Sequence, residues 1–221
     1  RGYQQINDTA LGLATVGDSS EVYGKADGAT VSLGDGGEAT IFLNQPLFNG
    51  LGADFAVFEN GFSPVFLELA FVEVSSNGTD FFRFPAVSET QIGTQTGSFG
   101  SLDASEIHNL AGKYHVNYGT PFDLDDLPDT NLLNKFAISH RKIIDVVGNM
   151  EMPFSSRDSR GNIINDPWPT PFGSSGFDLD AVGLIHVNGI NSIKEKNIVL
   201  NLFPNPAENW VTVSTDFRVK F

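Results

Sequence analysis

The stretch LELAFVEVSSNGTDFFRFPAV, residues 67–87, decides the fold class of this chain. Its first part contains Leu, Phe and Val and ends in Asn-Gly, the dipeptide most typical of a tight hairpin turn. Its second part, residues 79–87, is a short apolar and aromatic run that can return beside the first. The stretch therefore predicts a β-hairpin, the unit from which antiparallel sheets are built.

Further strands are predicted at residues 29–44, 53–60, 136–148 and 177–187. In the first of these ranges, two alternating runs flank Gly-Asp-Gly-Gly, which predicts a second hairpin. Two long irregular segments, 88–135 and 149–176, separate the strands, and long loops in a compact domain often carry binding or metal sites. Short strands with turn signals and long loops favour an all-β sandwich.

The domain organisation follows from a change in pattern near residue 187. We expect residues 1–187 to form the sandwich and the polar segment 188–197 to be a linker. Residues 198–221 resume the alternation of a short second β-unit. No run of 18 apolar residues occurs, so no transmembrane segment is predicted.

Composition narrows the possible partners. The chain has 221 residues, no cysteine, and a formal net charge of −14. The absence of cysteine excludes thiol catalysis, zinc–thiolate sites and disulfides. Such a negative surface repels phosphate backbones and anionic lipid, which argues against nucleic acid as a partner, whereas divalent cations suit it.

One candidate metal site lies at two strand ends. Asp178 and Asp180 are two residues apart on a predicted strand and should share one face, where two carboxylates repel unless a cation or donors separate them. Glu59 and Asn60 add oxygen atoms at the end of another strand. The pattern indicates a Ca²⁺ site, and the alternative is a set of carboxylates that accept backbone N–H groups.

A second acidic cluster, in PFDLDDLPD, contains Asp123 and Asp125 at a spacing that resembles a cation-binding loop. It lacks the Gly and terminal Glu of an EF-hand. Paired carboxylates can also hydrolyse glycosidic bonds. Because the sequence has no metalloprotease helix motif and no nucleophile-elbow motif, we predict a protein that is not an enzyme.

Aromatic residues in the irregular segments are candidate ligand contacts. Trp168 and Phe172 stand among prolines in DPWPTPF, where the backbone is held extended, and Tyr118 lies in a polar loop. Each could stack on a sugar ring or on a partner side chain. The alternative for Trp168 is that it closes the end of the sandwich.

The end of the chain resembles a known export signal. An apolar–aromatic pair, Pro-Asn-Pro, a small residue and an alternating strand occur together, as in the type A C-terminal sorting domain of Bacteroidetes type IX secretion substrates. The matching residues are Leu202, Phe203, Pro204, Asn205, Pro206 and Ala207. The resemblance covers only the start of such a domain. It implies export through the periplasm, contact with type IX translocon and shuttle proteins, and a secreted or cell-surface location. Asp-Thr-Ala at residues 8–10 also resembles the O-glycosylation site of that phylum, which would modify Thr9.

Most of residues 10–187 resemble a set of bacterial cell-surface proteins. The similarity lies in SLGDGGEATIFLNQPLFNGLGADFAVFENGF, LAFVEVSSNGTDFFRFP, AGKYHVNYGTPFDLDDL, IIDVVG and DPWPTPFGSSGFDLDAVG. The arrangement is similar to galactose-binding-like jelly rolls, which implies a structural Ca²⁺ and carbohydrate binding. We therefore expect a Ca²⁺-stabilised surface module that binds a glycan or a surface partner. The alternatives are an accessory protein of an outer-membrane uptake or secretion complex and a glycan-active hydrolase or lyase.

Overall fold

The computed structural model describes residues 1–187, so the predicted linker and sorting segment, 188–221, lie outside the described residues. Short 3-10 helices form at Thr9–Leu11 (η1), Ala104–Glu106 (η2) and Leu124–Asp126 (η3). The strands are β1 Val31–Ser32, β2 Glu38–Leu47, β3 Phe55–Glu59, β4 Ala70–Ser75, β5 Phe82–Arg83, β6 Val87–Ser88, β7 Ile107–His108, β8 Thr120–Phe122, β9 Ile138–Asp145 and β10 Asp178–Leu184.

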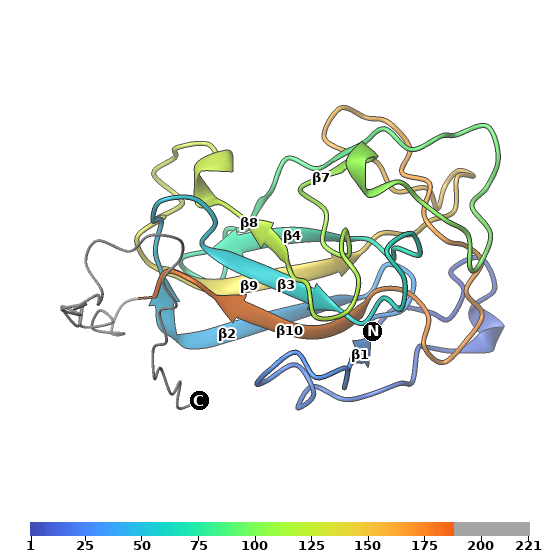
Figure 1. The fold of residues 1–221 in the computed structure, drawn as a ribbon, viewed down its shortest axis with the longest axis horizontal. Coiled ribbons are helices and arrows are strands. Elements are labelled where there is room, and N and C mark those ends of the chain that lie inside the picture. Colours follow the sequence, from blue (N-terminus) through green and yellow to red (C-terminus); the bar gives the residue numbers. More distant parts are fainter. Residues whose placement is uncertain (188–221) are drawn as a thin grey trace, which may run out of the picture. The chain divides into compact units, whose positions relative to one another are not determined.

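Eight of these strands form two four-stranded antiparallel sheets, with the orders β1-β10-β3-β8 and β2-β9-β4-β5. The late strand β10 pairs between β1 and β3, while β9 pairs between β2 and β4 (Figure 1). This interleaving of late with early strands, in two four-stranded sheets, is that of an eight-stranded jelly roll. The prediction of an all-β, jelly-roll sandwich is confirmed.

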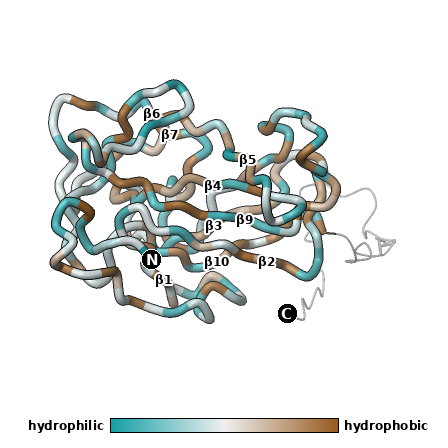
Figure 2. Tube along the Cα trace, turned by 180° about the vertical axis from the view of Figure 1, so that it is seen from behind, coloured by the Kyte–Doolittle hydropathy of each residue, from teal (hydrophilic) through white to brown (hydrophobic). Residues whose placement is uncertain are grey.

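The main core fills the space between the two sheets, because one face of each strand is apolar. On β3, Phe55 and Val57 are buried and alternate with half-buried residues. The Phe55 ring stacks on Phe122 of β8 at 5.4 Å and meets Phe84 edge-on at 5.8 Å. Figure 2 shows the hydropathy of each residue along the strands. Period-two patterning therefore places the apolar side chains between the sheets.

A second apolar cluster packs on the outer side of β4. Phe71 and Leu69 are buried there together with residues of the long loops, Leu102, Ile107 and Leu110. The loops therefore cover this sheet with their own small core rather than extending into solvent. This packing positions the loop residues that line the candidate site described below.

The predicted hairpin at residues 29–44 is wrong, because β1 and β2 belong to different sheets. The intervening turn closes with a hydrogen bond from Gly37 N to Gly34 O, and Gly34 has a positive φ of 77°. Asp35 N donates to Tyr3 O at 2.7 Å, and Gly36 N donates to the Asp145 carboxylate at 2.9 Å. These contacts direct the chain across to the other sheet. By contrast, the predicted hairpin at residues 67–87 forms, with Glu73 opposite Arg83.

A buried arginine occupies the central strand β9. Arg141 is 0% exposed, and its three side-chain nitrogens find no hydrogen-bond partner among the described residues. Its strand neighbours in register are Ile41 and Val74, and burial lowers its pKa to about 10. A desolvated, unpaired cation destabilises the folded state.

Arg141→Met is therefore expected to raise the free energy of unfolding, by about 1–4 kcal/mol, since it keeps the packing and removes the charge. Denaturant titration measures the change. Lys142→Met is the matched control: its ammonium lies 4.2 Å from the centre of the Phe81 ring, and we expect a change below about 1 kcal/mol. A less stable Arg141→Met protein would contradict the prediction.

Candidate functional site

A cavity of about 690 Å³ opens where four loops meet the adjacent ends of β3 and β10. This volume lies within the range of small-molecule sites in proteins. Its lining combines large apolar side chains with carboxylate, amide and hydroxyl groups. The lining residues are Val16, Gly17, Glu21, Gly28, Ala29, Thr30, Asn60, Phe62, Phe66, Glu68, Ser98, Phe99, Thr170, Phe172, Ser174 and Asp178.

Four phenylalanines form a continuous row along this pocket. Phe62 stacks on Phe66 at 4.5 Å between ring centres, Phe66 lies 5.9 Å from Phe99, and Phe99 stacks on Phe172 at 5.9 Å. Phe62 is 70% exposed, Phe99 68% and Phe172 42%. Because three separate loops supply them, the folded chain holds an apolar surface open to solvent, which commonly marks a binding site. We call these four side chains the phenylalanine row.

Polar groups lie at the strand ends beside the row. Asp178 accepts a hydrogen bond from the Ser32 hydroxyl and another from the Asn60 side chain. Asn60 also donates to the Thr30 hydroxyl at 3.3 Å. Glu68 is only 8% exposed but reaches the pocket lining. The polar part of the pocket comprises three carboxyl groups, those of Glu21, Glu68 and Asp178, the Asn60 amide, and the hydroxyl groups of Thr30, Ser98, Thr170 and Ser174.

More carboxyl groups lie buried near these two. Glu59 is 2% exposed, and one oxygen accepts from Gly61 N at 2.7 Å. The other, Oε1, has no partner in the part of the chain that the structure describes. Asp166 is similar, since Oδ2 accepts from Leu69 N at 3.3 Å while Oδ1 has no partner within residues 1–187. Buried acceptors left unpaired cost free energy unless a proton or a cation neutralises them.

The pKa values of this group reflect that cost. Burial, followed by the nearby Asp178, raises the pKa of Glu59 to about 8. Burial, then Asp178 and Glu59, raises the pKa of Glu68 well above its ordinary value. Burial raises the pKa of Asp178 to about 6. Desolvation and like charge act in the same direction, so protons are held more tightly than in water.

The predicted metal ligands at β3 and β10 are only partly brought together. Glu59, Asn60 and Asp178 are neighbours, as expected from sequence. Asp180 instead accepts from Asp27 N at 3.2 Å and Gly28 N at 3.1 Å. It lies at a β-bulge, where Leu179 pairs with Glu59 and Ala181 with Phe58. The extra residue disrupts the regular alternation that the two-residue spacing assumed.

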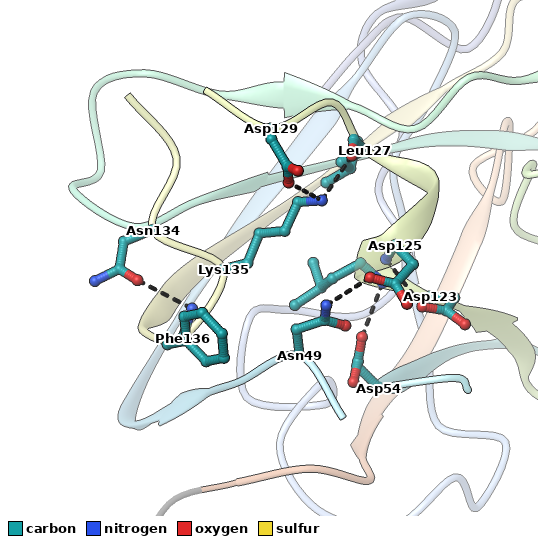
Figure 3. Close-up of polar contacts among 10 residues, drawn as sticks. Asn49, Asp54, Asp123, Asp125, Leu127, Asp129, Asn134, Lys135 and Phe136 are labelled. Atoms are coloured by element: carbon teal, nitrogen blue, oxygen red, sulfur yellow. Dashed lines mark hydrogen bonds and ion pairs between the residues drawn. The ribbon is translucent and has the colours of Figure 1, made fainter. Parts of the chain in front are cut away.

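The second predicted cluster serves as local structure. Asp123 accepts from Asp125 N at 2.9 Å and caps η3, while Asp125 accepts from the Asn49 amide at 2.7 Å (Figure 3). In the same loop, Asp129 forms an ion pair with Lys135 at 2.9 Å. Across residues 1–187, no group of three acidic or histidine side chains is placed to hold a metal ion. A bound Ca²⁺ stays a prediction.

The three aromatic residues predicted to contact a ligand lie at different places in the structure. Phe172 lines the pocket. Trp168 is half-buried, and its indole N–H donates to Asp35 at 3.1 Å, so it ties two loops together outside the pocket lining. Tyr118, 62% exposed, lines a second recess of about 300 Å³ with His115. Thr9 is exposed in η1, where a modifying sugar would have room.

Sequence reasoning missed Phe62, Phe66, Phe99 and Glu68. One signal was available in FENGFSPVF and GSFG. Both place phenylalanines in polar turn segments, where such side chains are not expected to belong to the core. Leu202, Phe203, Pro204, Asn205, Pro206 and Ala207, the predicted sorting residues, lie outside the described residues.

Comparison of the chain with protein-family models, with curated proteins and with solved structures gives no match. Among residues 1–187 there is also no helix whose length and hydropathy would let it cross a membrane.

Proposed function

We propose that this protein is a binding module whose pocket takes a glycan. The observation that carries the proposal is the phenylalanine row beside the Glu68 and Asp178 carboxyl groups and the Asn60 amide. Sugar rings present C–H faces that pack on aromatic rings, and their hydroxyl groups bond to carboxylates and amides. A mostly apolar pocket with a few convergent polar groups is the usual form of a small-molecule site.

The row is best tested by removing an exposed ring. Phe99 stands between Phe66 and Phe172, so Phe99→Ala breaks the row at its centre. We expect glycan affinity to fall by about 10-fold or more, which corresponds to about 1.4 kcal/mol. Because Phe99 is 68% exposed, its loss should leave the fold intact.

The measurement is a glycan-array screen followed by calorimetric titration of the hits. Phe136→Ala is the matched control, because Phe136 is 69% exposed and lies outside the pocket lining. Equal loss in both variants would contradict a pocket-specific role. Turnover of labelled polysaccharide by the wild-type protein would support the glycan hydrolase instead.

We propose further that a Ca²⁺ ion stabilises the buried carboxyl groups. Glu59 and Asp178 would supply ligands, with the Asn60 oxygen beside them. The support is chemical: these oxygens are hard ligands of the type that Ca²⁺ prefers, and one oxygen of Glu59 lacks a partner in the described structure. The pH titration described in the Discussion tests this ion.

Delivery to the cell surface by type IX secretion is also a proposal, and it rests on the resemblance at residues 202–207 alone. In a type IX-competent host, deleting residues 198–221 should leave the protein in the periplasm. Surface display without this segment would contradict the proposal.

A further inference from the structure

We infer that the ligand of this pocket carries a positive charge, a protonated amine, so that an amino sugar with a free amine is preferred to a neutral sugar. The inference rests on the proposed glycan-binding function and adds the charge of the ligand. It uses three observations: the signs of the lining charges, the buried carboxyl groups near them, and the aromatic row.

The titratable side chains of the lining are all acidic. Glu21, Glu68 and Asp178 line the pocket, and no lysine, arginine or histidine does so among the described residues. Arg1 is bonded to the same wall, but its guanidinium donates to the backbone carbonyls of Ala14 at 3.2 Å and Val16 at 3.0 Å. The Arg1 guanidinium therefore binds backbone carbonyl groups, and Arg1 does not line the pocket.

The buried carboxyl groups strengthen this asymmetry. Glu68 and Asp178 are 8% and 7% exposed, so water screens them poorly. Behind them, Glu59 carries an oxygen that accepts no hydrogen bond from any described residue. A neutral sugar would bury these groups further without compensating them. An ammonium group would favour the ionised form of these carboxyl groups, which burial otherwise disfavours, and would supply three hydrogen-bond donors.

The phenylalanine row favours the same ligand. The faces of aromatic rings attract cations and repel anions through their quadrupole. With Phe62 and Phe99 largely exposed beside Glu68, an ammonium can contact ring faces and a carboxylate together.

The test compares three β-1,4-linked tetrasaccharides that differ at carbon 2: those of glucosamine, N-acetylglucosamine and glucose. Calorimetric titrations at about pH 6.5 leave Asp178, whose pKa burial raises to about 6, mostly ionised and much of the amine protonated, and physiological salt screens long-range attraction. We expect the glucosamine form to bind at least about 10-fold more tightly than the two neutral forms, a difference of about 1.4 kcal/mol. Glu68→Gln and Asp178→Asn should each reduce this preference.

Two further variants separate the pocket from the general acidity of the chain. Phe99→Ala should weaken binding of the glucosamine form, whereas Glu38→Gln, at an exposed position of β2, should change nothing. An amine preference that survives Phe99→Ala, Glu68→Gln and Asp178→Asn would be surface attraction and would overturn the inference. The Ca²⁺ proposed above would compete with the amine for Asp178, so the titrations are run in EGTA and repeated with Ca²⁺. Loss of the preference on adding Ca²⁺ would overturn the inference, because the metal would then be the neutralising charge.

The same titrations distinguish failure of the inference from failure of the proposed function. Equal, Phe99-dependent binding of all three tetrasaccharides would overturn the amine preference and leave glycan binding intact. Absence of binding by all three, and by every glycan on the array, would overturn both.

Discussion

Asp54→Ala is expected to lower the free energy of unfolding by about 3–5 kcal/mol, the largest effect of any single substitution considered. Asp54 is 0% exposed. Its Oδ1 accepts from Gly50 N at 2.7 Å and meets His186 Nδ1 at 2.8 Å, while Oδ2 accepts from Leu124 N at 2.8 Å. Alanine would leave two backbone donors and a histidine without their acceptor, and each buried unsatisfied group costs about 1–3 kcal/mol.

The location of Asp54 explains why its loss should destabilise several segments of the chain. It directly precedes β3, and it holds the first residue of η3 (Figure 3). It also binds His186 in the segment after β10. Chemical denaturation measures the loss. The control is Asp125→Ala, which removes an exposed carboxylate bonded to Asn49 and should cost less than about 1 kcal/mol. Similar values for the two variants would show that the Asp54 contacts do not form in solution.

The metal-free protein should become less stable as the pH rises from about 4 to about 8. Burial raises the pKa of Glu59 from 4.5 to about 8 and that of Asp145 from 3.8 to about 8. Since the folded protein holds these protons more tightly than the unfolded chain, it is favoured at acidic pH. The penalty begins above the unfolded-state pKa and is complete above the folded-state pKa. Each such group contributes a slope of up to about 1.4 kcal/mol per pH unit inside this window.

Thermal melts across this pH range in the presence of EGTA measure the slope. Glu59→Gln should flatten the curve, because a neutral amide cannot ionise and can still accept from Gly61 N. Glu38→Gln on the exposed face of β2 is the control and should leave the slope unchanged. A melting temperature that increases steadily from acidic to slightly alkaline pH would contradict the prediction.

Calcium added at the alkaline end of this range tests the proposed ion. Bound Ca²⁺ would compensate the ionised carboxylates and restore the stability lost on deprotonation. An unchanged melting temperature at millimolar Ca²⁺ would reject the ion as a stabilising ligand.

The fold could be predicted to a large extent from local patterns. The strand around Phe71 and the strand around Leu179 follow from apolar runs bounded by turn residues, and both are present. The link between β1 and β2 could not be predicted in this way. Its Gly-Asp-Gly-Gly turn has the composition of a hairpin, but Gly36 N bonds to Asp145, more than a hundred residues further along the chain. A local pattern carries no information about such a partner.

Some features of the candidate site likewise follow from local sequence, and others only from the folded chain. The sequence by itself determined an all-β body, an acidic surface, and strand-end polar residues such as Asn60 and Asp178, because alternation and turn chemistry act over a few neighbouring residues. Only the tertiary structure decided that Phe62, Phe99 and Phe172 form one row and that Trp168 does not join it. These residues come from loops whose conformation depends on packing against distant strands. Their convergence is therefore a property of the folded chain and not of any segment.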